Sequence, residues 1–108
     1  MRLLTAAAVV TGAVSASPAL ADMIANVTEG QTWRIENTRG PNGRLTLNPD
    51  GTGRMRAGPI SVRATWERRG SQFCLTAGPI GTRCVALTAR GGGYAGAQNG
   101  ETVFRMSR

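Results

Sequence analysis

The two cysteines, Cys74 and Cys84, are the residues whose types and spacing most clearly allow chemistry between them. Each lies in a short run of alternating apolar and polar residues, and the turn-forming residues 77–81 separate the two runs. If the runs form a hairpin about that turn, Cys74 lies opposite Cys84, on the less apolar side. We therefore predict a disulfide. A metal-binding pair or a reactive thiol is disfavoured, because the chain has no histidine, no third cysteine and no CxxC spacing.

Side chains that usually act as general bases or nucleophiles are scarce. The chain has no histidine and no lysine, and its six carboxylates are scattered over turns and outer strand faces. The glycines at 91–93 lack the lysine and the following helix of a phosphate-binding loop. Residues 50–53 begin like a calcium loop, but the later oxygen ligands are missing. We therefore predict that the protein is not an enzyme and uses no metal, nucleotide or other cofactor.

Arginine supplies all of the positive charge of this chain. Thirteen arginines stand against six carboxylates, for a formal net charge of +7. Such a balance favours association with anionic surfaces, such as nucleic acid, lipopolysaccharide, phospholipid or an acidic protein. The alternative is that the arginines are simply the solvated outer faces of strands, and composition alone does not decide between the two.

Three arginines are expected to share one face. Arg54 and Arg56 alternate with apolar residues in one run, Arg63 does so in the next, and a tight turn at residues 58–59 joins the runs. Antiparallel pairing about that turn sets Arg54 opposite Arg63, with Arg56 diagonally within reach. Like charges in this arrangement repel each other, although screening by salt would let the side chains splay into water. We predict an anion-binding patch of these three residues.

The elements that must position these residues are short β-strands. Asp-Gly at 50–51 and Asn-Gly at 99–100 are strong hairpin signals, and residues 22–30 are weakly patterned, as either a helical turn or an extended lead-in. No stretch after residue 21 shows a helical period. We predict an all-β fold: a small antiparallel meander, closed or nearly closed into a barrel or sandwich of seven or eight short strands, with one disulfide. The predicted strands span residues 31–37, 44–48, 54–57, 60–67, 72–76, 82–88, 94–97 and 102–106.

The N-terminal segment has the pattern of a cleavable signal peptide. An apolar run follows Met1-Arg2, and the small residues Ala19 and Ala21 fit the cleavage pattern. The run is shorter than the roughly 20 residues that span a membrane. We expect residues 1–21 to be removed and residues 22–108 to form a single small β domain, periplasmic or secreted, with no transmembrane segment. Cleavage leaves 87 of the 108 residues and, without Arg2, a formal charge of +6.

Both tryptophans, Trp33 and Trp66, fall at inward positions of predicted strands. They could form a platform on which a ligand stacks, but a tryptophan at an inward position of a small barrel is more often part of the core. We predict core positions for both.

The pattern of turn and core residues resembles that of short, signal-peptide-bearing periplasmic β-domain proteins of alphaproteobacteria, some of which are automatically named dihydrodipicolinate reductase. It consists of residues 51–53, Trp66-Glu67-x-x-Gly70-x-x-Phe73-Cys74, Cys84 and a glycine-rich tail, within about residues 44–90. The resemblance implies a fold and a compartment. A reductase would need a nucleotide-binding βαβ domain, which this chain lacks. A more distant similarity is to eight-stranded periplasmic metalloprotease inhibitors, which share size, export and one disulfide.

From the sequence, we predict an exported, non-catalytic binding or structural module that contacts an anionic envelope component through an arginine-rich face. Its expected partners are an anionic lipid, lipopolysaccharide or an acidic protein. The alternative is an inhibitor of a secreted hydrolase, acting through a loop or through residues 22–30.

Overall fold

A computed structural model describes residues 19–108 of the protein, so most of the predicted signal peptide, residues 1–18, lies outside the described residues. Among residues 19–108, no helix is long and apolar enough to cross a membrane. One short helix precedes a series of strands. In chain order the elements are α3 (Leu20–Val27), β2 (Thr32–Asn37), β3 (Gly43–Leu47), β4 (Thr52–Ala57), β5 (Ile60–Arg69), β6 (Gln72–Ala77), the 3-10 helix η1 (Gly78–Ile80), β7 (Thr82–Arg90), β8 (Gly93–Gln98) and β9 (Glu101–Ser107).

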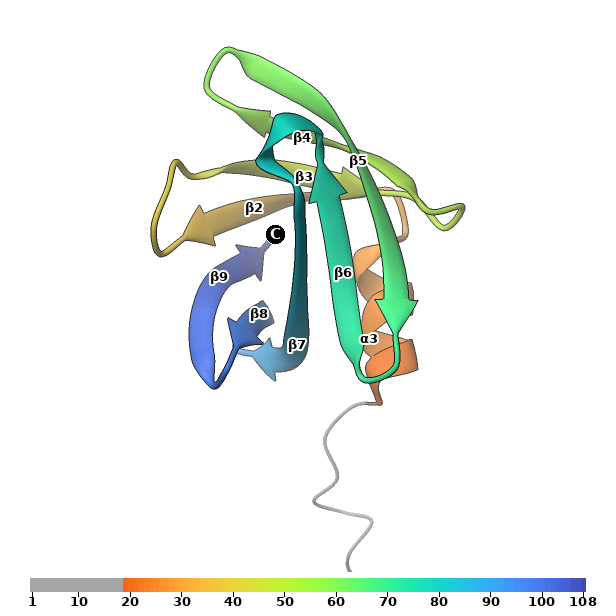
Figure 1. The fold of residues 1–108 in the computed structure, drawn as a ribbon. Helices are drawn as coiled ribbons and strands as arrows, with labels where there is room; N and C mark the ends of the chain where they lie inside the picture. The colour runs from red at the N-terminus through yellow and green to blue at the C-terminus, as the bar shows by residue number, and fades with distance from the viewer. Residues whose placement is uncertain (1–18) are drawn as a thin grey trace, which may run out of the picture.

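The strands form a closed eight-stranded antiparallel barrel (Figure 1). Each strand pairs with the next one along the chain, and β9 pairs with β2 to close the ring. The predicted antiparallel meander is therefore confirmed, and it is a barrel rather than a sandwich. Closure leaves no strand edge unpaired, so every strand contributes backbone hydrogen bonds on both sides.

The pairing across two hairpins follows the predicted register. Arg54 lies opposite Arg63 in the β4–β5 pair. In the β6–β7 pair Cys74 lies opposite Cys84, and the two residues form the predicted disulfide. Cys74 is 2% exposed but does not belong to the central apolar cluster. The disulfide therefore crosses the hairpin on the side that faces away from the barrel interior.

Helix α3 overlaps residues 22–30, which the sequence left open between a helical turn and an extended lead-in, and the structure shows the helical alternative. Its apolar residues Leu20, Met23, Ile24 and Val27 have helical spacing, but this pattern is incomplete when the domain is taken to start after Ala21. Met23, Ile24 and Val27 are buried, and Leu20 packs against the core. The statement that residues after 21 contain no helical stretch was therefore wrong, and this segment is engaged in the core.

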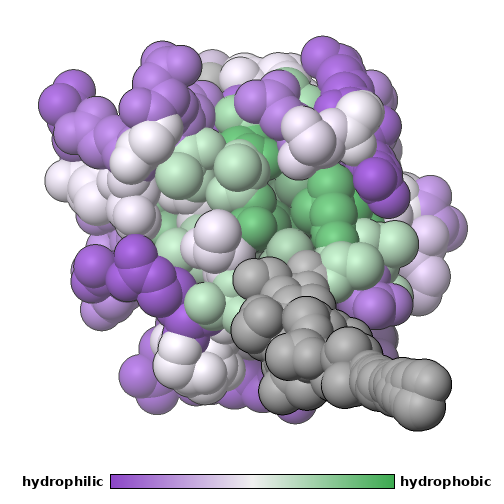
Figure 2. All heavy atoms as spheres, turned by 90° about the horizontal axis from the view of Figure 1, so that it is seen from below, coloured by the Kyte–Doolittle hydropathy of each residue, from purple (hydrophilic) through white to green (hydrophobic). Residues whose placement is uncertain are grey.

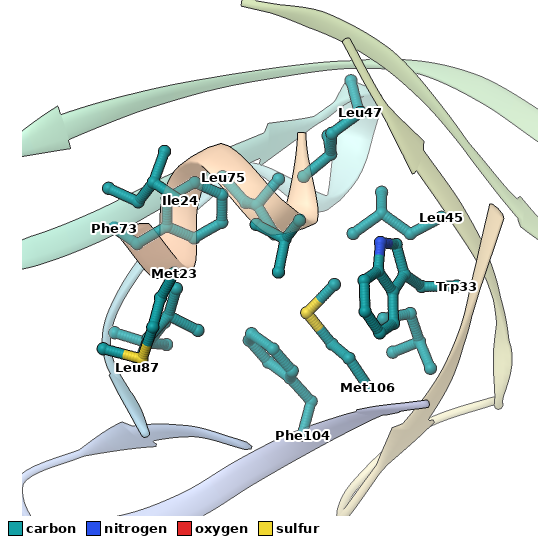
Figure 3. Packing of buried hydrophobic residues seen from close by; sticks show 14 residues of the cluster. Met23, Ile24, Trp33, Leu45, Leu47, Phe73, Leu75, Leu87, Phe104 and Met106 are labelled. Atoms are coloured by element: carbon teal, nitrogen blue, oxygen red, sulfur yellow. The ribbon is translucent and has the colours of Figure 1, made fainter. Parts of the chain in front are cut away.

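The barrel interior is an apolar cluster to which the helix and six of the eight strands, all but β4 and β8, contribute buried residues (Figure 3). Gly96 of β8 adds no side chain but makes room, because a β-carbon there would come within 2.5 Å of the Phe104 ring. Viewed from below Figure 1, hydrophobic residues show in the middle of the face and hydrophilic residues surround them (Figure 2). The cluster comprises Met23, Ile24, Val27, Trp33, Ile35, Leu45, Leu47, Ala64, Phe73, Leu75, Val85, Leu87, Phe104 and Met106.

The β3–β4 turn is held by hydrogen bonds to its own residues and to β5. The Trp66 indole N–H donates to the Asn48 carbonyl at 2.7 Å, and the Trp66 backbone N–H donates to the Gly51 carbonyl at 3.0 Å. The Asp50 carboxylate accepts two hydrogen bonds from Thr52, from its hydroxyl at 2.6 Å and its backbone N–H at 3.0 Å. The residues that resembled the start of a calcium loop therefore build a side-chain-capped turn.

Asp50 should make the stability of the protein depend on pH in the acid range. The hydrogen bonds from Thr52, the hydroxyl first, lower the pKa of this exposed carboxyl. Its contribution is therefore complete above the unfolded pKa of about 3.9 and is lost as the pH falls through the folded pKa. In thermal melts, Asp50→Asn should differ most from the wild type at neutral pH and converge with it in acid. A difference that is constant with pH would contradict this.

Candidate anion-binding face

The predicted patch of Arg54, Arg56 and Arg63 lies on the outer face of β4 and β5. All three side chains are exposed. Arg54 and Arg63 are direct cross-strand neighbours, and Arg56 lies opposite Ser61. The Arg54 guanidinium donates a hydrogen bond to the Ser61 hydroxyl at 3.2 Å, which keeps it over the neighbouring strand. The structure thus brings the three predicted residues together as the register implied.

Two further arginines, which the sequence analysis did not include, extend this patch across β3 and β2. Arg44 lies opposite Arg56, and Arg34 lies opposite Arg44. Both are exposed. We call Arg34, Arg44, Arg54, Arg56 and Arg63 the arginine face. The outward position of the two additional residues was visible in their alternation with Trp33, Ile35 and Leu45, but the register across the 38–42 loop was not.

The arginine face has no ion pair to neutralise it within residues 19–108. The single ion pair in that part of the chain joins Arg69 to Glu67 at 2.6 Å, at the far end of β5. Directly opposed like charges on a sheet destabilise it, typically by a few tenths of a kcal/mol up to about 1 kcal/mol per pair. The fold therefore carries three such arginine pairs, Arg34–Arg44, Arg44–Arg56 and Arg54–Arg63, and none of these arginines forms an ion pair within residues 19–108.

A groove of about 450 Å³ lies beside the arginine face, and Arg34, Arg44 and Arg56 line it. Part of its lining is bare backbone at Gly43 and Gly58. Gly43 is required there because a β-carbon would lie 2.1 Å from the Arg56 carbonyl oxygen. The groove therefore presents three guanidinium groups next to backbone that no side chain covers.

Glu36 is the one carboxylate among the residues that line this groove. On the side of β2 that pairs with β9, Glu36 lies opposite Arg105, so Arg105 borders the arginine face. With three arginines against one glutamate, the groove keeps an excess of positive charge.

The two tryptophans do not form a joint exposed platform on which a ligand could stack, because Trp33 is buried. Trp33 is 1% exposed, and Trp66 is half-buried against Phe73, with ring centroids 5.8 Å apart. The core interpretation therefore holds for Trp33 and, in part, for Trp66, whose indole also ties β5 to the β3–β4 turn.

No family model, no curated protein and no solved structure matches this chain. The resemblance to short periplasmic β-domain proteins therefore stays a prediction.

Proposed function

We propose that the protein is a non-catalytic binding module that contacts an anionic component of the bacterial envelope through the arginine face. The observation that carries the proposal is the alignment of five exposed arginines over four neighbouring strands, with no ion-pairing carboxylate among residues 19–108. A purely structural sheet gains nothing from this arrangement, because each opposed pair is repulsive. An anionic partner would turn the same residues into favourable contacts.

Phosphate groups are the chemistry that best fits this face. A guanidinium presents a planar set of donors that binds a phosphate through two parallel hydrogen bonds, and arginine is always charged. The face uses arginine alone, and the exposed backbone at Gly58, where a β-carbon would meet nothing within 4 Å, leaves room for a bulky head group to approach. The proposed partner is therefore a phosphate-bearing surface, such as anionic phospholipid or lipopolysaccharide, rather than an acidic protein.

An exported location belongs to this proposal. Disulfides persist in oxidising compartments and are rare in the bacterial cytosol. The Cys74–Cys84 disulfide supports export, and so does the signal-peptide pattern of residues 1–21. In the periplasm or outside the cell, phosphate-bearing lipid surfaces are accessible to the protein.

Charge reversal on the arginine face should remove binding to anionic vesicles. A cationic residue near an anionic membrane surface contributes about 1 kcal/mol, so Arg44→Glu with Arg56→Glu should weaken binding on the order of a hundred-fold. The assay is cosedimentation with phosphatidylglycerol-containing vesicles and, separately, with lipopolysaccharide, at low and high salt. Binding of the wild type should fall steeply with salt.

The matched control reverses two arginines elsewhere and changes the net charge equally. Arg105 is unsuitable because it borders the arginine face. Arg90 ends β7, which lies across the ring from β3, and Arg68 lies near the end of β5. Arg68→Glu with Arg90→Glu should weaken binding less than about ten-fold, since screening limits distant charges. Equal losses in the two double variants would show that net charge alone is responsible, and would contradict the proposal.

A further inference from the structure

A second cavity, of about 400 Å³, opens at one end of the barrel and is separate from the arginine face. It lies between the β2–β3 loop, the β4–β5 turn and the β6–β7 turn with η1. In Figure 1 the β4–β5 turn and η1 lie at the upper end of the barrel, while α3 lies at the lower end. The helix thus fills one end of the interior, and the other end stays open.

The wall of this cavity is apolar and incompletely covered. Met55, Ala57, Ile60 and Val62 occupy the inward positions of β4 and β5, yet none of them is buried. Ile60 is 61% exposed, and it is the large hydrophobic residue most clearly left in solvent within the described chain. Deeper in the cavity, Ile35, Leu45, Leu75 and Phe104 belong to the buried core. Apolar groups exposed at the mouth of a barrel are typical of a site that an apolar ligand fills.

The mouth carries two arginines, on different walls. Arg83 of β7 is in register with Leu75 and alternates with the buried Val85 and Leu87, so it occupies an inward position where a packed barrel would hold an apolar residue. Arg39 comes from the β2–β3 loop, and β3 and β7 lie across the ring from each other. Both are exposed, and neither forms an ion pair within residues 19–108. The cavity therefore combines an apolar wall with two cationic groups at its rim.

We propose that this cavity binds a single-chain amphipathic anion, with its aliphatic chain among Met55, Val62 and Leu75 and its carboxylate or phosphate head group at Arg39 and Arg83. A pocket of this size lies near the lower end of the range for small-molecule sites, about 300 to 1,000 Å³, which suits one chain rather than a two-chain lipid. Arginine at the rim keeps its charge in water while its stem lies along the apolar wall. This site is on the inner side of the sheet, so the proposal does not depend on the function of the arginine face.

Isothermal titration of the purified protein with laurate, dodecyl phosphate and dodecanol, all below their aggregation limits, tests the proposal. At least one of the two anions should bind with a stoichiometry of one and about ten-fold or more tighter than dodecanol, because charge-assisted hydrogen bonds are stronger than neutral ones. The two anions show which head group is preferred. Arg39→Gln with Arg83→Gln should remove most of the preference for anions and leave dodecanol binding nearly unchanged.

A second pair of variants tests the location of the chain. Ala57→Phe places a ring in the open mouth from a half-buried inward position, and should lower the affinity for all three ligands about ten-fold or more. Ala86→Phe adds the same ring on the outward side of β7 and should leave binding unchanged. The Arg44→Glu, Arg56→Glu variant should also bind as the wild type does. The proposal is overturned if no anion binds saturably, if dodecanol binds as tightly as both anions, or if Ala57→Phe binds like the wild type.

Discussion

Replacing Trp33 by alanine should lower the free energy of unfolding by about 3 to 5 kcal/mol, the range for removing a large buried aromatic side chain. Trp33 is 1% exposed and is among the largest fully buried side chains of the barrel. Its ring makes an edge-to-face contact with Tyr94, with centroids 5.8 Å apart, and the Arg108 guanidinium lies 5.0 Å from its centroid. Small domains have a total stability of about 5 to 15 kcal/mol, so Trp33→Ala should be unfolded or nearly so in a urea titration followed by circular dichroism.

Two other variants show whether the loss of stability comes from the missing Trp33 ring or from any substitution in β2. The Trp33 indole N–H is buried with no hydrogen-bond partner among the described residues. Trp33→Phe removes that unsatisfied donor while keeping an aromatic ring, so it should lose less than half as much stability as Trp33→Ala. Thr32→Ala, at the exposed neighbouring position, removes only the cross-strand hydrogen bond to the Thr46 hydroxyl at 2.9 Å and should cost about 1 kcal/mol or less. A Trp33→Ala protein within about 1 kcal/mol of the wild type would show that the ring is not a core element.

Removing the disulfide should have the next largest effect. Cys74 and Cys84 are 10 residues apart, and closing a loop of this size stabilises the folded state by about 2 to 3 kcal/mol on the chain-entropy model. The double variant Cys74→Ala, Cys84→Ala should therefore melt about 10 to 20 °C below the wild type, since 1 kcal/mol corresponds to about 4 to 8 °C in a domain of this size. Differential scanning calorimetry of the wild type and the double variant, both produced under oxidising conditions, compares their melting temperatures.

The adjacent cross-strand pair provides the control for this experiment. The Thr76 and Thr82 hydroxyls lie 2.7 Å apart on the same hairpin and make an exposed hydrogen bond. Thr76→Ala with Thr82→Ala removes this contact but leaves the cross-link, so it should cost about 1 kcal/mol or less. If the threonine variant loses as much stability as the cysteine variant, the hairpin surface rather than the covalent bond accounts for the effect.

The hairpin registers could be predicted from the sequence because they depend on local information. Alternation assigns each residue to one face of a strand, and a short turn then leaves little choice of pairing. This is why the Arg54–Arg63 and Cys74–Cys84 pairs were predicted correctly. The same reasoning did not extend across residues 38–42, because a longer loop does not determine the register of the strands that it joins. Arg34 and Arg44 were therefore missing from the predicted patch.

The sequence by itself determined the antiparallel strands, the disulfide and the outward position of the arginines, because each follows from side-chain alternation and turn chemistry within one hairpin. The tertiary structure alone decided three other features: the closure of β9 onto β2, the packing of α3 into one end of the barrel, and the opening of the other end between Arg39 and Arg83. All three depend on contacts between segments far apart in the chain. Periodicity shows which side of a strand is apolar, but that side is buried only where other segments of the chain pack against it. Ile60 is the example, since it has the pattern of a core residue and yet lies exposed at the mouth of the barrel.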